Sequence, residues 1–199
     1  SKITTTVQTT TTQQVSIANE TAVSTTSSGT SVSQATAAAS SSQNQSKYEA
    51  NVASVAGKMD NRVIAAYQQL GFKLVVDPSV NYSGYFDARS RSITMKQIDD
   101  SVYHELGHFL AFIAGNVDKT ASFQSIFAAE KANVTAFNKA YVTQNASEYF
   151  AESVKDYILN NASLKSTRPQ TYAAVQNALN QITDAQIAKI QKIYGAFWN

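Results

Sequence analysis

Apolar residues recur every three or four positions through most of the chain after residue 46, which is the spacing of helices that bury one face. Gly71 directly follows the apolar pattern that ends at residue 70, and glycine is a typical residue at a helix end. Asp99 or Asp100 could cap a later helix that ends at about Ala114, before Gly115. The full pattern predicts helices at about 47–58, 60–70, 100–114, 120–131, 133–141, 147–160, 169–181 and 184–197.

Three short segments among the early helices have the pattern of strands. Phe72–Asp77 is rich in Val and Leu and is ended by Pro78. Gly84–Asp87 and Ser92–Met95 are predicted to form two antiparallel strands joined by Ala88–Arg91. Because the strands come early and the helices late, we expect an α+β fold, with a small sheet and its hairpin in the N-terminal half packed on a predominantly helical part.

The first 46 residues have a different composition from the rest. Of these residues, 31 are Ser, Thr, Gln or Asn, and no aromatic residue precedes Tyr48. Such a stretch buries too little apolar area to offset the entropy of ordering. We predict a Ser/Thr-rich low-complexity tail or stalk at 1–46 and a folded domain at 47–199. A strand at Ile3–Ile17 and a helical extension at Gln34–Ala39 remain open as alternatives.

Composition and charge exclude several classes of function. A formal net charge of +2 over 199 residues is too small for a strongly basic nucleic-acid binder, so we expect no nucleic-acid partner. No apolar run approaches the roughly 18 residues of a membrane span. The absence of Cys excludes disulfides, thiolate nucleophiles and Cys-ligated metals. The N-terminus has no basic cluster followed by a hydrophobic stretch, so we expect no signal peptide in this sequence.

The sequence His104-Glu105-Leu106-Gly107-His108 carries the main chemical signal. Residues four apart lie above one another on a helix, so two imidazoles there can bind one zinc ion. Glu105 is one step round the helix, where it can act as a general base on the attacking water. The chain has only two histidines, both in this motif, which makes a chance match improbable.

Zinc bound by two histidines needs a further protein ligand, and Glu148 and Glu152 are the candidates. They are four apart on a later predicted helix, with Ser147 as a suitable N-cap. We expect Glu148 to be the third ligand, and Glu152 to accept the second N–H of a zinc-binding imidazole, that of His104. On sequence alone the roles of the two glutamates could be exchanged. A site of this type also needs a donor for the developing oxyanion, and Tyr141 is placed where it could reach over the zinc.

In this motif and in the spacing of the residues around it, the sequence resembles the catalytic domain of anthrax lethal factor. It resembles the secreted Pro-Pro endopeptidases of clostridia and bacilli more strongly. The shared features are the HELGH sequence, the Tyr seven residues before Glu148, and the segment Glu148–Ser153. The resemblance covers about residues 44–181 and includes these further segments: the helix pair at 49–70 with the Lys-Leu-Val strand after it, 121–128, 164–166 and 169–172.

The resemblance implies a zincin domain of the gluzincin type with one zinc ion per chain. It implies that His104, His108 and Glu148 bind the zinc, that Glu105 is the base, and that Tyr141 stabilises the oxyanion. It also implies a secreted endopeptidase that acts on extracellular or surface proteins, and we expect a monomer that binds its protein or peptide substrate in an extended conformation.

The sequence departs from that family around the substrate. Val80–Tyr103 is short, whereas Pro-Pro endopeptidases have a long lid with an aromatic clamp there, and Ser147 stands where the family tends to have an acidic residue. We therefore expect cleavage near proline without a strict Pro-Pro rule. We expect the substrate to lie along Gly84–Arg91, and the candidate contacts are Tyr85, Phe86, Arg89, Arg91 and Ser147, with either Tyr85 or Phe86 packed in the core.

Two other classes of function are compatible with parts of the sequence. A binding or adhesion module could keep the zinc fold without catalysis, although such a protein would have no need of Glu105 and Tyr141. A partner-binding helical protein could use an apolar stripe on its last helix, which more simply covers the domain core. The stripe consists of Ile187, Ile190, Ile193, Tyr194 and Phe197.

Overall fold

The computed structural model describes residues 46–199. The tail predicted at 1–46, with its possible strand at Ile3–Ile17 and helix at Gln34–Ala39, lies outside these residues except for Ser46. None of the helices in the described part is both long enough and apolar enough to cross a membrane.

A four-stranded sheet lies in the N-terminal half, and its strand order is β1-β2-β4-β3. The strands are β1 (Tyr48–Ala50), β2 (Lys73–Val76), β3 (Gly84–Asp87) and β4 (Ser92–Met95). β1 is antiparallel to β2, β2 is parallel to β4, and β4 is antiparallel to β3. β3 is therefore an edge strand, and among residues 46–199 no strand pairs with its outer side.

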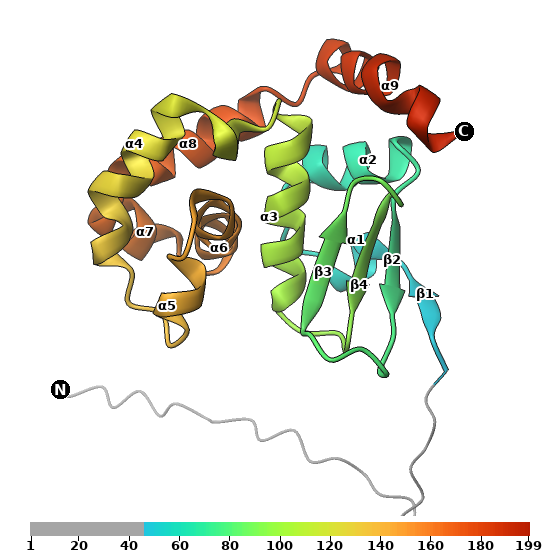
Figure 1. Cartoon of the computed structure of the whole chain (residues 1–199), viewed down its shortest axis with the longest axis horizontal. Coiled ribbons are helices and arrows are strands. Elements are labelled where there is room, and N and C mark those ends of the chain that lie inside the picture. Colours follow the sequence, from blue (N-terminus) through green and yellow to red (C-terminus); the bar gives the residue numbers. More distant parts are fainter. Residues whose placement is uncertain (1–45) are drawn as a thin grey trace, which may run out of the picture. The chain divides into compact units, whose positions relative to one another are not determined.

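The helices form the rest of the domain. They are α1 (Val52–Val55), α2 (Asn61–Gln69), α3 (Ser101–Ile113), α4 (Ala121–Glu130), α5 (Lys139–Val142), α6 (Ala146–Leu159), α7 (Asn161–Thr167), α8 (Pro169–Asn180) and α9 (Asp184–Trp198), with 3₁₀ turns η1 (Val117–Lys119) and η2 (Lys131–Asn133). Figure 1 shows α3 between the sheet and the group of helices from α4 to α8. The fold is α+β, as predicted.

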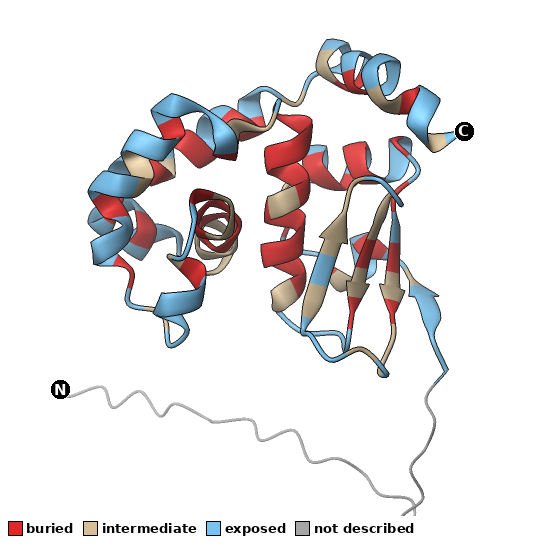
Figure 2. Ribbon diagram, in the orientation of Figure 1, coloured by how far each residue is buried: buried red, intermediate tan, exposed pale blue. Residues whose placement is uncertain are grey.

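Helix α3 is the centre of the domain core. Eleven of its thirteen residues are buried, and it is coloured as buried along most of its length in Figure 2. A helix that is apolar on nearly all sides must be covered on all sides, and the sheet and α6 provide this cover. The motif residues on α3 are therefore held by packing from both halves of the domain.

Tyr67 joins α2 to the sheet from inside the core. Its hydroxyl donates a hydrogen bond to the carbonyl of Lys73 at 2.6 Å and accepts one from the N–H of Ile93 at 3.2 Å. These two bonds connect α2 to β2 and β4, and they satisfy a phenol that is fully buried.

Three sequence predictions of helices are wrong or incomplete. The predicted helix at 47–58 is strand β1 followed by the single turn α1, because 48–50 pair with β2 and the Asn51 side chain caps Ser54. The predicted helix at 133–141 is reduced to α5, which leaves 134–138 outside any helix. Helix α7 was not predicted.

The hairpin of β3 and β4 has the predicted bounds, with Arg91 at a positive φ of 51° in the turn.

The apolar stripe of α9 divides between core and surface. Ile187 and Ile190 are buried, and Tyr194 packs against the core, whereas Ile193 and Phe197 are exposed. The inner part of the stripe thus covers the domain, as the simpler reading predicts.

Candidate metal and catalytic site

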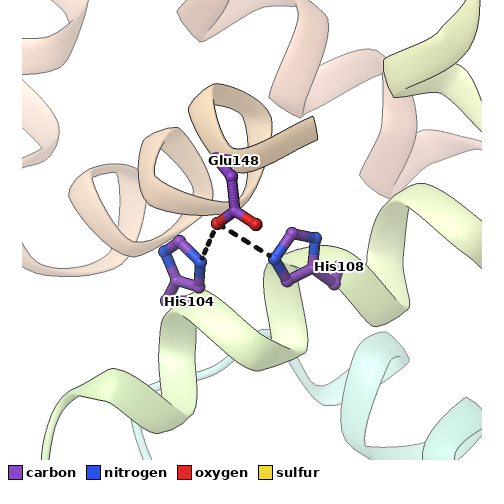
Figure 3. A group of neighbouring side chains, drawn as sticks. All are labelled: His104, His108 and Glu148. Carbon is purple, nitrogen blue, oxygen red and sulfur yellow. Dashed lines mark hydrogen bonds and ion pairs between the residues drawn. The ribbon is translucent and has the colours of Figure 1, made fainter. Parts of the chain in front are cut away.

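His104 and His108 present the same ring atom to one carboxylate. The Nε2 atom of His104 lies 3.0 Å from Oε2 of Glu148, and the Nε2 atom of His108 lies 3.5 Å from the same oxygen. Figure 3 shows both imidazoles rising from α3 toward Glu148, which extends from α6. The helical spacing of the motif and the position of α6 together bring three donor groups to one point.

Glu148 is held in the first turn of α6 by a cap. The side chain of Asn145, not Ser147, is the N-cap, and its oxygen accepts the N–H of Glu148 at 2.8 Å. Ser147 lies inside the helix, and its hydroxyl donates to the carboxylate of Asp118. The predicted capping role of Ser147 is thus wrong, because the N-cap of the helix lies two residues earlier than expected.

The three donor groups fit a zinc ion. Their ligand atoms all lie within 4.8 Å of one another. Two ligands at the usual zinc distances in a tetrahedral arrangement are roughly 3.4 Å apart, which is close to the two distances to Glu148 Oε2. Two imidazoles and one carboxylate are also a donor set that zinc accepts in catalytic sites.

Glu152 orients His104 from the other side of its ring. Its Oε2 lies 2.7 Å from Nδ1 of His104, one helical turn beyond Glu148. Burial by itself would lower the pKa of His104, but the bonds to Glu148 and Glu152 outweigh it and raise the pKa to about 9. Burial would raise the pKa of Glu152, and the bond to His104 lowers it instead. Glu152 is thus placed where a carboxylate can fix the orientation of the His104 ring.

Glu105 is buried beside the start of β3. Burial raises the pKa of its carboxyl group, and the nearby imidazoles of His104 and His108 act in the opposite direction. Gly84 makes this position possible, since a Cβ atom there would lie 2.8 Å from both Cγ and Oε1 of Glu105. The backbone of β3 therefore determines where the carboxyl group of Glu105 can lie.

Tyr141 reaches the same space from α5. Burial raises the pKa of its phenol, and the negative charge of Glu148 adds to this effect, so the phenol stays protonated and can donate a hydrogen bond. Its side chain is 54% exposed. A donor that is partly open to solvent is accessible to a substrate.

A cavity of about 470 Å³ brings these groups together. The start of β3 forms one wall, and α3, α5 and α6 form the others. The lining residues are Tyr82, Ser83, Gly84, Ser101, His104, Glu105, Asn138, Tyr141, Glu152 and Lys155. The free edge of β3 thus lies beside the candidate catalytic groups.

The candidate substrate contacts have different surroundings. Tyr85 is 57% exposed, whereas Phe86 packs against the core, in line with the predicted alternation. Arg89 is an exposed residue of the hairpin turn. Arg91 does not face a substrate, because its guanidinium donates to the carbonyls of Leu70 and Trp198. The assignment of Arg91 as a substrate contact is therefore corrected to a structural role.

The sequence did not single out several residues of the cavity. Gly84 was predicted as the start of a strand along which the substrate lies, but not as a neighbour of Glu105. Tyr82 and Asn138 belong to segments without a recognisable motif. The position of Lys155 could have been inferred from the sequence, because it lies three residues after Glu152 and so shares its helix face. In the structure its ammonium lies 3.6 Å from that carboxylate. The others meet the site only because the fold brings distant segments together.

The comparisons with known proteins agree with this geometry. Residues 88–178, which span β4 to α8, match the sequence model of the family "Anthrax toxin lethal factor, N- and C-terminal domain". The chain is also similar to the Pro-Pro endopeptidase of Clostridioides difficile (strain 630), with 41% identity over 78 residues. That match covers 37% of this chain and 34% of the relative, so the chain spans about a third of the relative's length. The resemblance seen in the sequence is confirmed as a similarity: the matched residues 88–178 hold the candidate site, and the chain is similar over part of its length to a Pro-Pro endopeptidase.

Proposed function

We propose that this domain is a zinc-dependent endopeptidase. The observation that carries the proposal is the convergence of His104, His108 and Glu148 at one point, beside a cavity that Glu105 and Tyr141 also line. His104, His108 and Glu148 would hold the metal. When bound, zinc supplies a Lewis acid that polarises a carbonyl and makes water more acidic.

Glu105 would carry the proton in this reaction. Its carboxylate would accept a proton from the attacking water and then pass that proton to the nitrogen of the leaving amine. A general base works best when its pKa approaches the working pH, and burial shifts the pKa of Glu105 in that direction. Gly84 leaves room for this carboxyl group, because a Cβ atom at that position would lie only 2.8 Å from Oε1 of Glu105.

Tyr141 would stabilise the negative charge on the former carbonyl oxygen. Its phenol is an uncharged donor with a raised pKa, so it keeps its proton near neutral pH. The loss of one such donor typically slows turnover by roughly 10²–10³-fold. Intact catalytic groups favour a working enzyme over a silent binding module.

The substrate would bind as an added strand along β3. The outer edge of β3 is unpaired in the described part of the chain, and Ser83 and Gly84 line the cavity beside Glu105. Backbone hydrogen bonds to an edge strand hold a peptide extended, which presents its carbonyl groups in a regular row. This arrangement favours an endopeptidase that accepts a segment of a longer chain.

Cleavage near proline and action outside the cell are parts of the same proposal. The relative is named a Pro-Pro endopeptidase, and the short Val80–Tyr103 segment offers little with which to enclose a Pro-Pro bond. We therefore propose a looser preference for proline. Peptides that differ only at the two residues flanking the cut test this: cleavage restricted to Pro-Pro peptides would contradict it. Secretion rests on the resemblance alone.

Metal removal and replacement test the proposed function. A degenerate peptide mixture is incubated with zinc-loaded protein, chelated protein and chelated protein given zinc again, and the cut sites are mapped by mass spectrometry. We expect cleavage in the first and third samples only. The double variant His108→Ala/Glu148→Ala should retain no zinc, whereas Glu49→Ala, at an exposed site on β1, should bind it normally. Cleavage that continues without zinc would rule the proposal out.

A further inference from the structure

A second cavity lies on the His108 side of the site, at the other end of β3 from the main cavity. The main cavity is lined by Gly84 at the start of β3, whereas the second is lined by Phe86 and by Ala88, which follows the strand. Its volume is about 240 Å³, and the ring of His108 forms part of its lining. A peptide added along β3 across the catalytic centre would pass this cavity.

Flat aromatic rings form the apolar walls of this second cavity. The ring of Phe86 is stacked with that of His108, with centroids 6.5 Å apart and an interplanar angle of 16°. Phe112 also lines the cavity, and its ring centroid lies 6.2 Å from that of Phe86 at an interplanar angle of 48°. Surfaces of this kind contact the aliphatic stem of a side chain favourably.

Asp118 adds a carboxylate to this lining. The residue is only 5% exposed, and the hydroxyl of Ser147 donates to its Oδ2 atom. Within residues 46–199, no Lys or Arg forms an ion pair with Asp118, and no hydrogen bond to its Oδ1 is found. No fully buried side-chain oxygen of residues 46–199 lacks a hydrogen-bond partner, so Oδ1 of Asp118 is not fully buried. Asp118 is one of the residues that line the cavity.

Lys119 is the one Lys or Arg residue in the lining of this cavity, and it is exposed. Water and salt screen an exposed charge, whereas a buried charge acts through a lower effective dielectric. The attraction of Asp118 for a cation inside the cavity should therefore exceed the repulsion from Lys119.

We propose that this second cavity is a substrate subsite for a lysine or arginine side chain. The aliphatic stem lies along Phe86 and Phe112, and the cationic head binds Oδ1 of Asp118. The proposal rests on the proposed function, because it needs a peptide bound along β3. The competing role of Asp118 is structural, since its bond to Ser147 holds η1 against the start of α6.

Cleavage specificity separates these two roles. Zinc-loaded full-length protein cuts a degenerate peptide mixture that contains Lys, Arg and norleucine at every position, and the products are sequenced by mass spectrometry. We expect Lys and Arg to be enriched over norleucine at one fixed position relative to the cut, by roughly 10-fold or more, as for one charged hydrogen bond. Asp118→Asn should remove the enrichment and still cut norleucine peptides, and Lys119→Met should increase it. An equal loss of rate on all peptides in Asp118→Asn, with the enrichment unchanged, would show a structural role and overturn the subsite.

A binding measurement keeps the subsite distinct from the proposed function. Zinc-loaded Glu105→Gln protein is titrated with Nα-acetyl-lysine methylamide or its norleucine analogue, and the amide NMR signals of 116–119 are followed. We expect shifts with the lysine compound only, and none after an added Asp118→Asn change. Selective binding without any peptide cleavage by the wild-type protein would refute the proposed function and support this cavity only as a binding site for a basic side chain. Peptide cleavage without basic enrichment would refute the subsite alone.

Discussion

A Cβ atom on Gly107 would lie 2.7 Å from both the Cα atom and the carbonyl oxygen of Ala151. Helices α3 and α6 thus meet backbone to backbone at this point. Gly107 lies between the two motif histidines in sequence, and Ala151 lies between Glu148 and Glu152. The close approach of these two small residues brings the carboxylates of α6 within reach of the imidazoles of α3.

Gly107→Ala should therefore damage the metal site through packing. The new methyl group meets backbone atoms that cannot move without separating the helices, and overpacking of this kind typically costs about 1–3 kcal/mol. We expect a lower free energy of unfolding in urea and a clearly weaker zinc affinity in metal titrations. Gly57→Ala is the matched control, because its nearest contact would be an ordinary 3.7 Å. Unchanged zinc affinity in Gly107→Ala would contradict this role.

Gly84→Ala should impair catalysis without loss of zinc. Its Cβ atom would displace the side chain of Glu105, which is flexible, and would leave His104, His108 and Glu148 in place. We expect kcat to fall by at least 10-fold, since a small misplacement of a catalytic group is costly. Steady-state kinetics together with metal analysis check this. Equal losses of zinc and activity would show that the effect of Gly84 is not specific to Glu105.

The raised pKa of His104 predicts how stability depends on pH after zinc has been chelated. The pKa is about 9 in the folded chain and about 6.5 in an unfolded one. Folding therefore favours the protonated ring, and this contribution is fully present below about pH 6.5 and is lost as the pH rises through about 9. The free energy of unfolding, measured in urea at a series of pH values, should fall across that interval. His104→Gln should lack this fall, and an equal fall in this variant would assign it to other groups.

Tyr141→Phe should lower kcat by roughly 10²–10³-fold and leave zinc content unchanged, because it removes one donor to the oxyanion and no metal ligand. The same exchange in Tyr48→Phe is the control, since Tyr48 is exposed on β1, at the opposite edge of the sheet from β3. Steady-state kinetics on one cleaved peptide give the comparison. A near-normal kcat in Tyr141→Phe would transfer the oxyanion role to another group.

Much of the candidate site is visible in the sequence because its residues lie in local patterns. The i and i+4 spacings of His104 with His108 and of Glu148 with Glu152 need only helices to place each pair on one face. The hairpin of β3 and β4 was predicted with its correct bounds for the same reason, since period-two alternation and a turn define it locally.

The remaining features depend on tertiary contacts that no local pattern encodes. Residues 48–50 form a strand because β2 lies beside them, against the apolar spacing that predicted a helix. Arg91 was predicted as a candidate substrate contact, but the fold brings Trp198 to it, and the guanidinium lies 5.3 Å from the centroid of that ring. The contacts of Gly84 with Glu105 and of Gly107 with Ala151 likewise arise only when the domain is assembled.

The most direct test of the account is the activity of zinc-loaded Glu105→Gln protein. Glutamine has nearly the same shape as glutamate but cannot accept a proton, so the variant should bind one zinc per chain and lose the proton transfer. On a peptide that the wild-type protein cleaves, kcat/KM should fall by roughly 10²–10⁴-fold, the usual contribution of general acid–base catalysis. Cleavage by the zinc-loaded variant at close to the wild-type rate would contradict the assignment of Glu105 as the base and, with it, the proposed mechanism.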